Sequence, residues 1–483
     1  MGTRYLLLLI FGGIFQFAVV VQSQAQALTA PTDSLVRVVN CPIGAGPQRI
    51  AAIVFAGNSV TKVATLRAEL DIQEGDTLRP ETLPARLEAN RARLFNLQLF
   101  HVVRVLASCQ PGGQLTLLFS VQERWYLFPL PILTLADRNL NAWLDRPDRW
   151  RRFDYGLYVR RENFRGRNEK LTITLQHGFN RRYELFYEAP GFGRRRRVGL
   201  GLGASYFQSR TLDYATRDDR LVAYRNETGF PIQRLFFTAG LRLRATVQFI
   251  TAFDVAYHRQ QIDDSARRLN PDFYLGRRQR EFMDVTLTST HNQRNTFAYP
   301  LSGQFAQAQF SHRQFLDRRI PAVSTLRLRY ARYVPLGRGF YSSSGVVSQL
   351  RLARQLAYPD RRALGYEFFV RGYDAYVIDG RYFALVQQGL SYQLLRPRTV
   401  RLPGLRNPQF GEVPLTLYGN IFADGGLVAA AGPGPDNQLP NRLLGTVGLG
   451  LHIVTYYDRT FVVEYSRNGR GETGFFLRTA FPI

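Results

Sequence analysis

The sequence predicts a small α+β domain followed by a sixteen-stranded antiparallel β-barrel that spans a membrane. Three observations carry this prediction: the chain opens on a secretory signal, residues 49–123 mix strand-like runs with helical spacing, and from about residue 150 apolar residues recur at every second position. No segment after the signal has the roughly 18 consecutive apolar residues that a transmembrane helix needs. A chain of this kind that crosses a membrane must therefore do so as a closed barrel.

Residues 1–27 have the features of a signal peptide. Arg4 supplies the positive start, Tyr5–Val21 is the apolar run, and Ala25–Ala27 offers a small-residue cleavage site. A membrane anchor is the alternative, but polar QSQAQA follows the run in place of a basic cluster. We therefore expect export, with an N-terminal extension over residues 28–48.

The chain carries a formal net charge of +26. A charge of this size ordinarily suggests a nucleic-acid partner, but export argues against one. Two other uses of the basic residues remain, namely a basic barrel lumen and basic loops that face phosphate-bearing lipid headgroups. We accordingly expect membrane lipid, including anionic headgroups, as a partner.

The two cysteines, Cys41 and Cys109, bracket the predicted α+β domain's helices. An oxidising compartment allows a disulfide between them, and the sequence leaves their pairing open. Two cysteines and six scattered histidines give no metal-ligand spacing, so we expect no metal and no cofactor.

Residues 49–123 predict the order strand, helix, helix, strand, strand. The run IAAIVFAG is strand-like, Asn58 and Ser59 suit a helix start, and a second helix begins near Pro80. Apolar residues recur at helical spacing in both helices: Val63, Leu66 and Leu70 in the first, Leu83, Leu87 and Leu94 in the second. Two further strands flank the PGG turn at residues 111–113.

This order resembles a POTRA domain, the periplasmic module of outer-membrane assembly and transport proteins. The resemblance rests on the FAGN turn after the first strand, on EGDTL between the helices, and on NRARLFNLQLFHVVRV, where the second helix leads into a strand. We find one such domain, and we assign residues 124–152 to a linker and residues 153–483 to the barrel.

The alternation beyond residue 150 places one apolar face against a face of glycine, polar residues and arginine. In LFFTAGLRLRA and STLRLRY, for example, leucines alternate with arginines. A soluble β-sandwich shows the same alternation, but export and strand segments of about ten residues favour a transmembrane barrel. Because an arginine on the lipid face costs roughly 2–4 kcal/mol near the midplane, four arginines are expected in the lumen: Arg242, Arg244, Arg327 and Arg329.

Sixteen strand segments can be placed between residues 153 and 482, the first at 153–162 and the fifth at 220–229. The even number puts both barrel ends on the side of the N-terminal domain. In this topology the RRRR run at 194–197 lies in an outer loop. That loop is either simply solvated or binds anionic lipid headgroups, and the sequence does not choose between the two.

The stretch FVRGYDAYVIDG lies in an outer connection and carries Arg371. Alternation in LTLYGNIFADGG puts Asp424 on the lumenal face of a strand. A lumenal carboxylate in a basic barrel is a natural partner for an arginine on a loop that folds inward, because the planar guanidinium can bind both carboxylate oxygens.

These two stretches together resemble the paired signature of the BamA/TamA superfamily, also called the bacterial surface antigen family. The matching residues are Val370, Arg371, Gly372 and Tyr373 in the loop, and Phe422, Asp424 and Gly426 in the strand. The resemblance implies that loop 365–380 folds into the lumen and that Arg371 pairs with Asp424. NFRGRN at 163–168 is similar to the family's first outer hairpin, and RNTFAYPLSG at 294–303 to an inner-side turn.

The resemblance implies a role in inserting β-barrel clients into the outer membrane or in translocating a protein across it. The partners would be outer-membrane lipid and an unfolded client, bound at the N-terminal domain and at a seam between Tyr155–Arg160 and Phe475–Phe481. We found no G-x-S-x-G, H-E-x-x-H or phosphate-binding loop, and we predict no enzyme. The alternative is a passive anion-selective pore or structural barrel.

Overall fold

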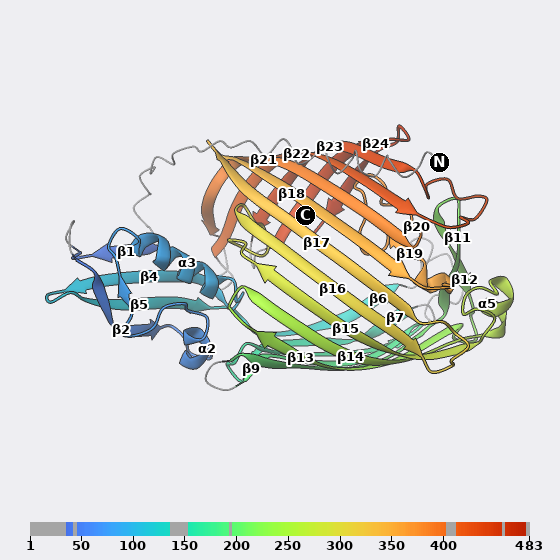
Figure 1. The fold of residues 1–483 in the computed structure, drawn as a ribbon, viewed down its shortest axis with the longest axis horizontal. Coiled ribbons are helices and arrows are strands. Elements are labelled where there is room, and N and C mark those ends of the chain that lie inside the picture. The colour runs from blue at the N-terminus through green and yellow to red at the C-terminus, as the bar shows by residue number, and fades with distance from the viewer. Residues whose placement is uncertain are drawn as a thin grey trace.

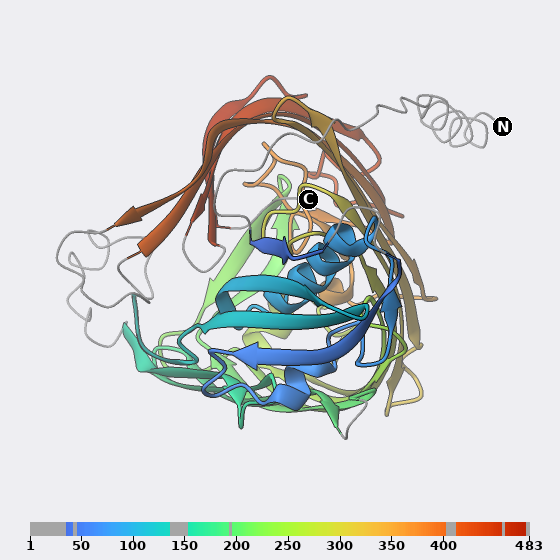
Figure 2. The ribbon, with the colours of Figure 1, turned by 90° about the vertical axis from the view of Figure 1, so that its left-hand side faces the viewer.

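The computed structural model describes residues 35–41, 46–135, 153–192, 196–401, 412–455 and 459–479. They form an N-terminal α+β domain and a large antiparallel sheet that curls into a barrel (Figure 1). Figure 2 looks along the barrel from the side of the N-terminal domain, which lies in front of one opening. We call that opening the inner end of the barrel and the opposite one the outer end.

The N-terminal domain packs two helices on a five-stranded sheet in the order β1-β4-β5-β2-β3. Its core combines Leu66, Leu83, Leu87 and Leu94 of the predicted helices with strand residues such as Phe119, all of them buried. The predicted face of the first helix is only partly confirmed, because Leu70 lies beyond the end of α2 and is partly buried, and Val63 is exposed. The predicted order strand, helix, helix, strand, strand is confirmed, with β1 and β3 as additions. The elements are β1 Val36–Val39, β2 Gln48–Ala56, α2 Val63–Arg67, β3 Thr77–Leu78, α3 Leu83–Phe95, β4 Phe100–Gln110 and β5 Gln114–Glu123.

The barrel sheet has sixteen strands, and each pairs antiparallel with its neighbours. The predicted number is therefore confirmed. The strands are β6 Leu127–Leu135, β7 Phe153–Phe164, β8 Glu169–Gly178, β9 Arg181–Phe192, β10 Val198–Ser209, β13 Ile232–Arg244, β14 Phe249–Ile262, β15 Gln279–Asn292, β16 Gly303–Phe315, β17 Val323–Gly337, β18 Phe340–Leu352, β21 Tyr382–Arg401, β22 Glu412–Ala429, β23 Leu443–Thr455, β24 Arg459–Asn468 and β25 Thr473–Arg478.

Two strand assignments from the sequence are wrong, and their errors cancel in the count. Leu127–Leu135, which we assigned to the 124–152 linker, is the first barrel strand and pairs with β7. Residues 220–229 do not form a barrel strand, because Arg220–Arg225 is β12, which pairs with β11 (Thr211–Arg217) in a separate hairpin. Strand β6 contains Pro129 and Pro131, and proline within a run argues against a central strand, so the sequence did not predict it. The two prolines are tolerated because β6 is an edge strand of the sheet.

The missed first strand reverses the side on which the early turns lie. The 163–168 turn lies at the inner end, as do Arg196 and Arg197, the two residues of the 194–197 run within the described ranges. There Gly166 and Arg196 contact the N-terminal domain. Both were expected at the outer end. From β13 onward the wrongly predicted strand at 220–229 offsets the missed strand β6, so the predicted and observed strand directions agree again. The 294–303 turn therefore lies at the inner end as expected, with Asn295 against Asn96.

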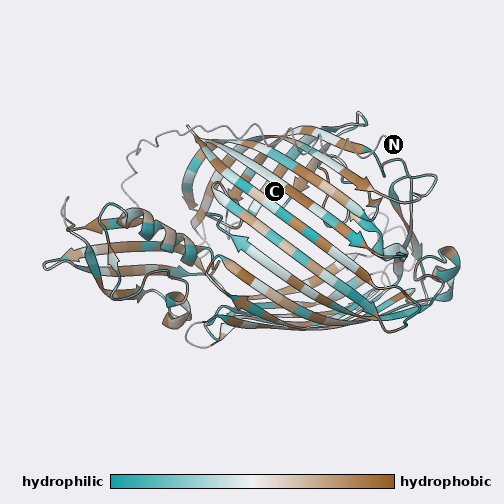
Figure 3. Ribbon diagram, viewed as in Figure 1, coloured by the Kyte–Doolittle hydropathy of each residue, from teal (hydrophilic) through white to brown (hydrophobic). Residues whose placement is uncertain are grey.

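Side chains alternate along the barrel strands as the sequence predicts, which appears in Figure 3 as alternating teal and brown. Leu241 and Leu243 are about half exposed on the outside, whereas Arg242 and Arg244, which alternate with them, point inward into ion pairs. Among the described residues, no helix has the length and apolar character required to cross a membrane.

The outer connections carry the remaining elements. Helix α5 (Asp264–Leu269) lies between β14 and β15. The connection from β18 to β21 contains the 3-10 helix η2 (Tyr358–Asp360), β19 (Arg362–Leu364) and β20 (Ile378–Asp379). This connection folds back into the barrel, and its inner part positions the candidate site.

Candidate functional site

The inward loop 365–380 is held in the lumen by an apolar cluster against β21, β22 and β23. Val370, Tyr373 and Ile378 of the loop pack with Phe383 and Val428 of the wall, and all five are at most 5 % exposed. The cluster resembles a small protein core, so the loop has a defined position against one side of the barrel wall.

Arg371 is buried at the centre of this contact. Its Nη2 donates to Asp424 Oδ1 at 2.6 Å, its Nε donates to Oδ2 at 2.8 Å, and its backbone N–H donates to Oδ2 at 3.2 Å. The guanidinium lies 3.8 Å from the centre of the Phe422 ring. The two paired side chains are 1 % and 0 % exposed, so this is a desolvated, bidentate ion pair.

A second carboxylate, Glu464 of β24, shares the site. Arg371 Nη1 donates to Glu464 Oε1 at 3.3 Å, and Arg478 of β25 donates from Nε to Glu464 Oε2 at 2.8 Å. Arg478 also pairs with Asp374 of the loop at 2.6 Å. The cluster therefore joins the loop to the last barrel strand, and its two arginines are matched by three carboxylates.

Sequence reasoning missed Glu464 and Arg478 because we looked for a partner of Arg371 only in the thirteenth predicted strand. The signal was present in FVVEYSRN, where alternation puts Glu464 and Ser466 on the same lumenal face. A second lumenal carboxylate in a basic barrel is as informative as the first.

The other motif residues fit closely around Arg371. Gly372 has φ +80°, and a Cβ there would lie 2.8 Å from Ser466 Oγ. Gly426 leaves room for Val370, whose Cγ2 would lie 2.5 Å from an added Cβ. The Tyr373 hydroxyl accepts from the Gly469 N–H at 3.2 Å. Glycine and tyrosine at these positions thus allow the loop to approach the wall.

The four arginines predicted to line the lumen all lie on the inward face, but the structure does not bring them into one site. Arg242 pairs with Asp254 at 2.7 Å, and Arg327 pairs with Glu367 of the loop segment at 2.9 Å. Arg329 lies over the Phe305 and Phe368 rings, each 5.4 Å away. Arg244 reaches out of the barrel to the N-terminal domain.

The N-terminal domain docks on four inner turns of the barrel. Arg244 Nη1 donates to Glu69 Oε1 at 2.7 Å, and Asn96 Nδ2 donates to the Asn295 carbonyl at 3.1 Å. The Lys62 N–H donates to the Gly166 carbonyl at 3.0 Å. Arg196 Nη1 donates to Thr65 Oγ1 at 3.3 Å. The 163–168 turn and Arg196 therefore help to hold the two domains together.

Glu123, at the end of β5, organises the junction between the two domains. Its carboxylate accepts from Ser59 Oγ at 2.6 Å and from the Val60 and Thr61 N–H groups at 2.9 and 2.6 Å. Asn163 of the first inner turn donates to Thr61 Oγ1 at 2.8 Å. Burial opposes ionisation of Glu123, but the hydrogen bonds outweigh it and lower the pKa of this carboxyl.

Cys41 and Cys109 form a disulfide that ties the N-terminal extension to β4. Just before Cys41, β1 pairs in parallel with Val105–Ser108 of β4. The extension thus covers one edge of the domain sheet with a strand of this same chain. Among the described residues, no group of three or more His, Cys, Asp or Glu is arranged to hold a metal ion.

Comparison with known protein families finds a match within each part of the chain. Residues 163–380 match the Omp85 superfamily domain, and residues 48–124 match the POTRA family, described as a surface antigen variable number repeat. No curated protein matches the chain.

Two solved structures are similar over most of the chain. CdiB from Escherichia coli is 13% identical, with a TM-score of 0.51, over 90% of this chain and 76% of that one. BamA from Haemophilus ducreyi lacking POTRA domains 1-3 is 15% identical, with a TM-score of 0.49, over 89% and 83% of the two chains. The first of these likenesses shows a shared fold.

Proposed function

We propose that this chain, a POTRA-bearing barrel of the Omp85 superfamily, inserts β-barrel client proteins into the outer membrane. The observation that carries the proposal is the seam of the barrel. Strands β6 and β25 are the two ends of the sixteen-stranded sheet and share no pairing within the part of the chain that the structure describes. Unpaired strand edges are templates on which a further strand can add.

The seam strands are β6 and β25, and not the second strand that contains Tyr155–Arg160, which pairs on both sides. Strand β25 has six residues, against twenty in β21 and eighteen in β22. A short end strand has few ladder hydrogen bonds to hold it. Phe475 and Leu477 on β25 are 78% and 82% exposed, which suits contact with lipid or with a client strand.

The buried loop favours insertion through the seam over passage through the lumen. Secretion would require loop 365–380 to leave the lumen, which breaks the desolvated pair of Arg371 and Asp424. Lateral opening leaves the Arg371–Asp424 pair intact, because β6 and β25 share no pairing within the described residues. Secretion of a client is the second candidate, and a passive pore is the third, since a plugged lumen conducts poorly.

We propose that the N-terminal domain lies in the periplasm, where it would receive unfolded clients. We propose no enzymatic activity for the protein. A client segment can add to the β4 edge only when β1 moves away. The Cys41–Cys109 disulfide holds β1 in place.

The double variant Cys41→Ser with Cys109→Ser tests this edge. We expect it to cross-link more of an unfolded client peptide to β4 than the wild type does, and reduction of the wild type should have the same effect. Equal cross-linking with and without the disulfide would contradict a role for this edge.

The test of the proposal is to lock the seam. Cysteine pairs placed across Leu127–Leu135 and Thr473–Arg478 are screened for oxidative cross-linking, and cross-linked protein is reconstituted in liposomes with an unfolded barrel client. The matched control is Leu157→Cys with Leu175→Cys, which joins register partners on the permanently paired β7 and β8.

We expect the seam lock to abolish client insertion, reduction to restore it, and the control lock to leave it unchanged. Full insertion by seam-locked protein would exclude the lateral mechanism. A large, steady conductance of the wild type in planar bilayers would favour the pore instead.

A further inference from the structure

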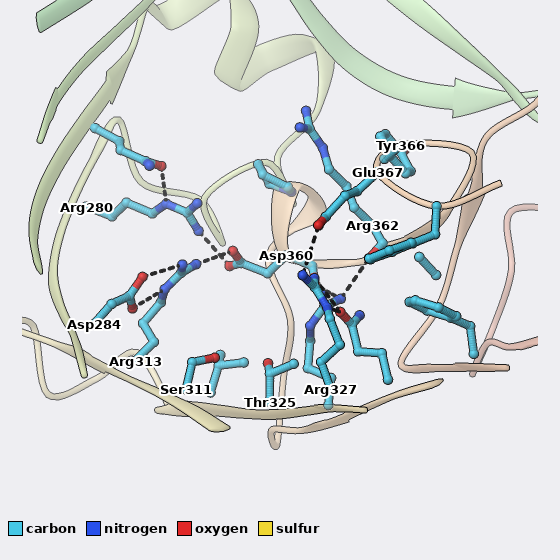
Figure 4. A pocket seen from close by; sticks show the side chains of 18 of the residues that line it. Arg280, Asp284, Ser311, Arg313, Thr325, Arg327, Asp360, Arg362, Tyr366 and Glu367 are labelled. Atoms are coloured by element: carbon cyan, nitrogen blue, oxygen red, sulfur yellow. Dashed lines mark hydrogen bonds and ion pairs between the residues drawn. The ribbon is translucent and has the colours of Figure 1, made fainter. Parts of the chain in front are cut away.

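A cavity of about 600 Å³ lies inside the barrel, between the lumenal face of the wall and the segment Pro359–Phe368 that precedes the Arg371 motif. Its wall residues come from β13 to β18 near their outer ends and from Phe383 at the outer end of β21. Figure 4 shows Arg280, Arg313 and Arg327 projecting from the wall toward Asp360 and Glu367 of the segment. The volume is typical of a site for a small molecule, and the cavity is separate from the Arg371 cluster.

The lining has a surplus of positive charge. Its six arginines are Arg234, Arg280, Arg313, Arg327, Arg351 and Arg362, and its three carboxylates are Asp284, Asp360 and Glu367. The difference, six minus three, is three positive charges. Asp213 on β11 and Asp379 on β20 lie outside the lining and attract cavity arginines, Asp213 attracting Arg234 and Arg362 and Asp379 attracting Arg351.

Some of the six arginines form ion pairs with carboxylates of the lining and others do not. Asp360 binds Arg280 and Arg313, each at 2.6 Å, and Glu367 binds Arg327 at 2.9 Å. Among the described residues, neither Arg234 nor Arg362 has an ion pair. Arg362 lies 5.0 Å from the Tyr366 ring, and Arg351 donates to backbone carbonyls.

Two buried donors are left without an acceptor. Gln349 is 1% exposed and lines the cavity; its Oε1 accepts from Arg327, but its Nε2 has no hydrogen-bond partner in the described structure. The Nε of Arg234 is also buried without a partner. Because buried donors are almost always satisfied, these two side chains are the candidates to bind an acceptor that enters the cavity.

We propose that the cavity binds a phosphate-bearing anion of the monoester or pyrophosphate class. A phosphate monoester carries up to two negative charges at neutral pH, opposite in sign to the surplus of the lining, and it offers several acceptor oxygens to converging guanidinium groups. Arg234 and Gln349 of the wall and Arg362 of the segment would bind it. The bound anion would then link the segment Pro359–Phe368 to the barrel wall, at a place where the arginines outnumber the carboxylates.

Isothermal titration of the purified full-length protein in zwitterionic detergent tests the proposal. Pyrophosphate and inorganic phosphate are titrated in buffers in which they replace chloride at constant ionic strength. The screening of the protein's charges by salt therefore stays the same throughout. The variants are Arg234→Gln and Arg362→Gln. The matched control is Arg242→Gln, which removes an arginine from the same face of β13 outside the cavity.

We expect one pyrophosphate per chain, an affinity loss of about tenfold or more in each cavity variant, and an unchanged affinity in the control. Equal losses in the control and in the cavity variants, or no saturable binding, would overturn the proposal. Gln349→Met, which keeps the side-chain volume, replaces any cavity variant that fails to fold and is expected to weaken binding as well.

The source of the phosphate is decided by competition. Nanodiscs that contain phosphatidic acid compete with pyrophosphate if the natural ligand is a lipid headgroup, whereas only soluble phosphate esters compete if it is free; phosphatidylcholine nanodiscs are the control. An acidic peptide that displaces pyrophosphate with higher affinity would overturn the assignment to phosphate. The proposal does not depend on client insertion, so locking the seam leaves this binding unchanged.

Discussion

The connection between β18 and β21 meets the barrel wall in two places whose charges are arranged differently. At Arg371 the two arginines are matched by carboxylates of the wall and loop, and the pair with Asp424 is fully buried. At Asp360 the carboxylate belongs to the connection, the arginines belong to the wall, and positive charge is left over. At the first contact the arginine charges are matched by carboxylates of this chain, whereas at the second the bound anion would match the remaining positive charge.

The difference indicates that the two contacts have different roles. A buried ion pair that is fully satisfied holds one geometry, because any displacement leaves desolvated charges unpaired. A contact that contains a ligand-binding cavity becomes more stable as the concentration of the bound anion rises. The inner part of the connection therefore serves as a fixed attachment, and the outer part as an adjustable one.

The largest expected effect is at Asp424. Asp424→Ala leaves Arg371 buried without its main partner and should destabilise the barrel by about 3–5 kcal/mol, while the chain still folds. The control is Asp254→Ala, which breaks the partly exposed pair with Arg242 and should cost about 1 kcal/mol or less. Urea unfolding in lipid vesicles measures both, and equal losses would remove the distinction between the two pairs.

Asp360→Asn tests the adjustable contact. It releases Arg280 and Arg313 and should destabilise the barrel by about 2–3 kcal/mol in chloride buffer. Pyrophosphate should restore part of this loss, because the variant increases the positive surplus, and it should restore nothing in Asp424→Ala. Thermal unfolding with and without pyrophosphate provides the measurement; rescue of both variants would show a nonspecific effect of the anion.

Glu464→Gln is expected to have a smaller effect, about 1.5 kcal/mol, since Arg371 keeps Asp424 and Arg478 keeps Asp374. The loss should concentrate in β25, which Arg478 anchors. Hydrogen exchange should become faster in Thr473–Arg478 and stay unchanged in β7. Uniformly faster exchange across the barrel would argue against a link between the loop and the seam.

The smallest effect concerns the junction between the two domains at low pH. The pKa of Glu123 is lowered in the folded protein, so its contribution is present above the unfolded value of about 4.3 and is lost as the pH falls through the folded value. We expect the N-terminal domain to loosen below about pH 4 in the wild type. Glu123→Gln should be less stable at pH 7 and show a weaker pH dependence, measured by hydrogen exchange of the Ser59–Thr61 backbone at each pH.

Much of the fold could be predicted because its signals are periodic. Alternation along β13 and β17 predicts both the barrel and the inward arginines, and leucine spacing predicts α3. Strand β6 could not be recognised by the same means, since prolines interrupt its pattern and its place in the sheet depends on pairing with β7 alone. The false strand at 220–229 has strand-like residues that form an outer hairpin.

The candidate site was only partly predictable for a related reason. Arg371 and Asp424 stand in short motifs that resemblance brings together across 53 positions of sequence. Glu464, Arg478 and the cavity arginines have no such motif. Their association depends on the path of the loop inside the barrel, which local spacing does not specify.

The most direct test of the account compares the outer-membrane and secreted proteomes of cells with and without this gene, complemented by the wild type or by Arg371→Ala. The account predicts that many β-barrel proteins fall together without the gene, that the wild type restores them, and that Arg371→Ala, present at equal level, does not. Loss of a single exported protein, or full restoration by Arg371→Ala, would contradict it.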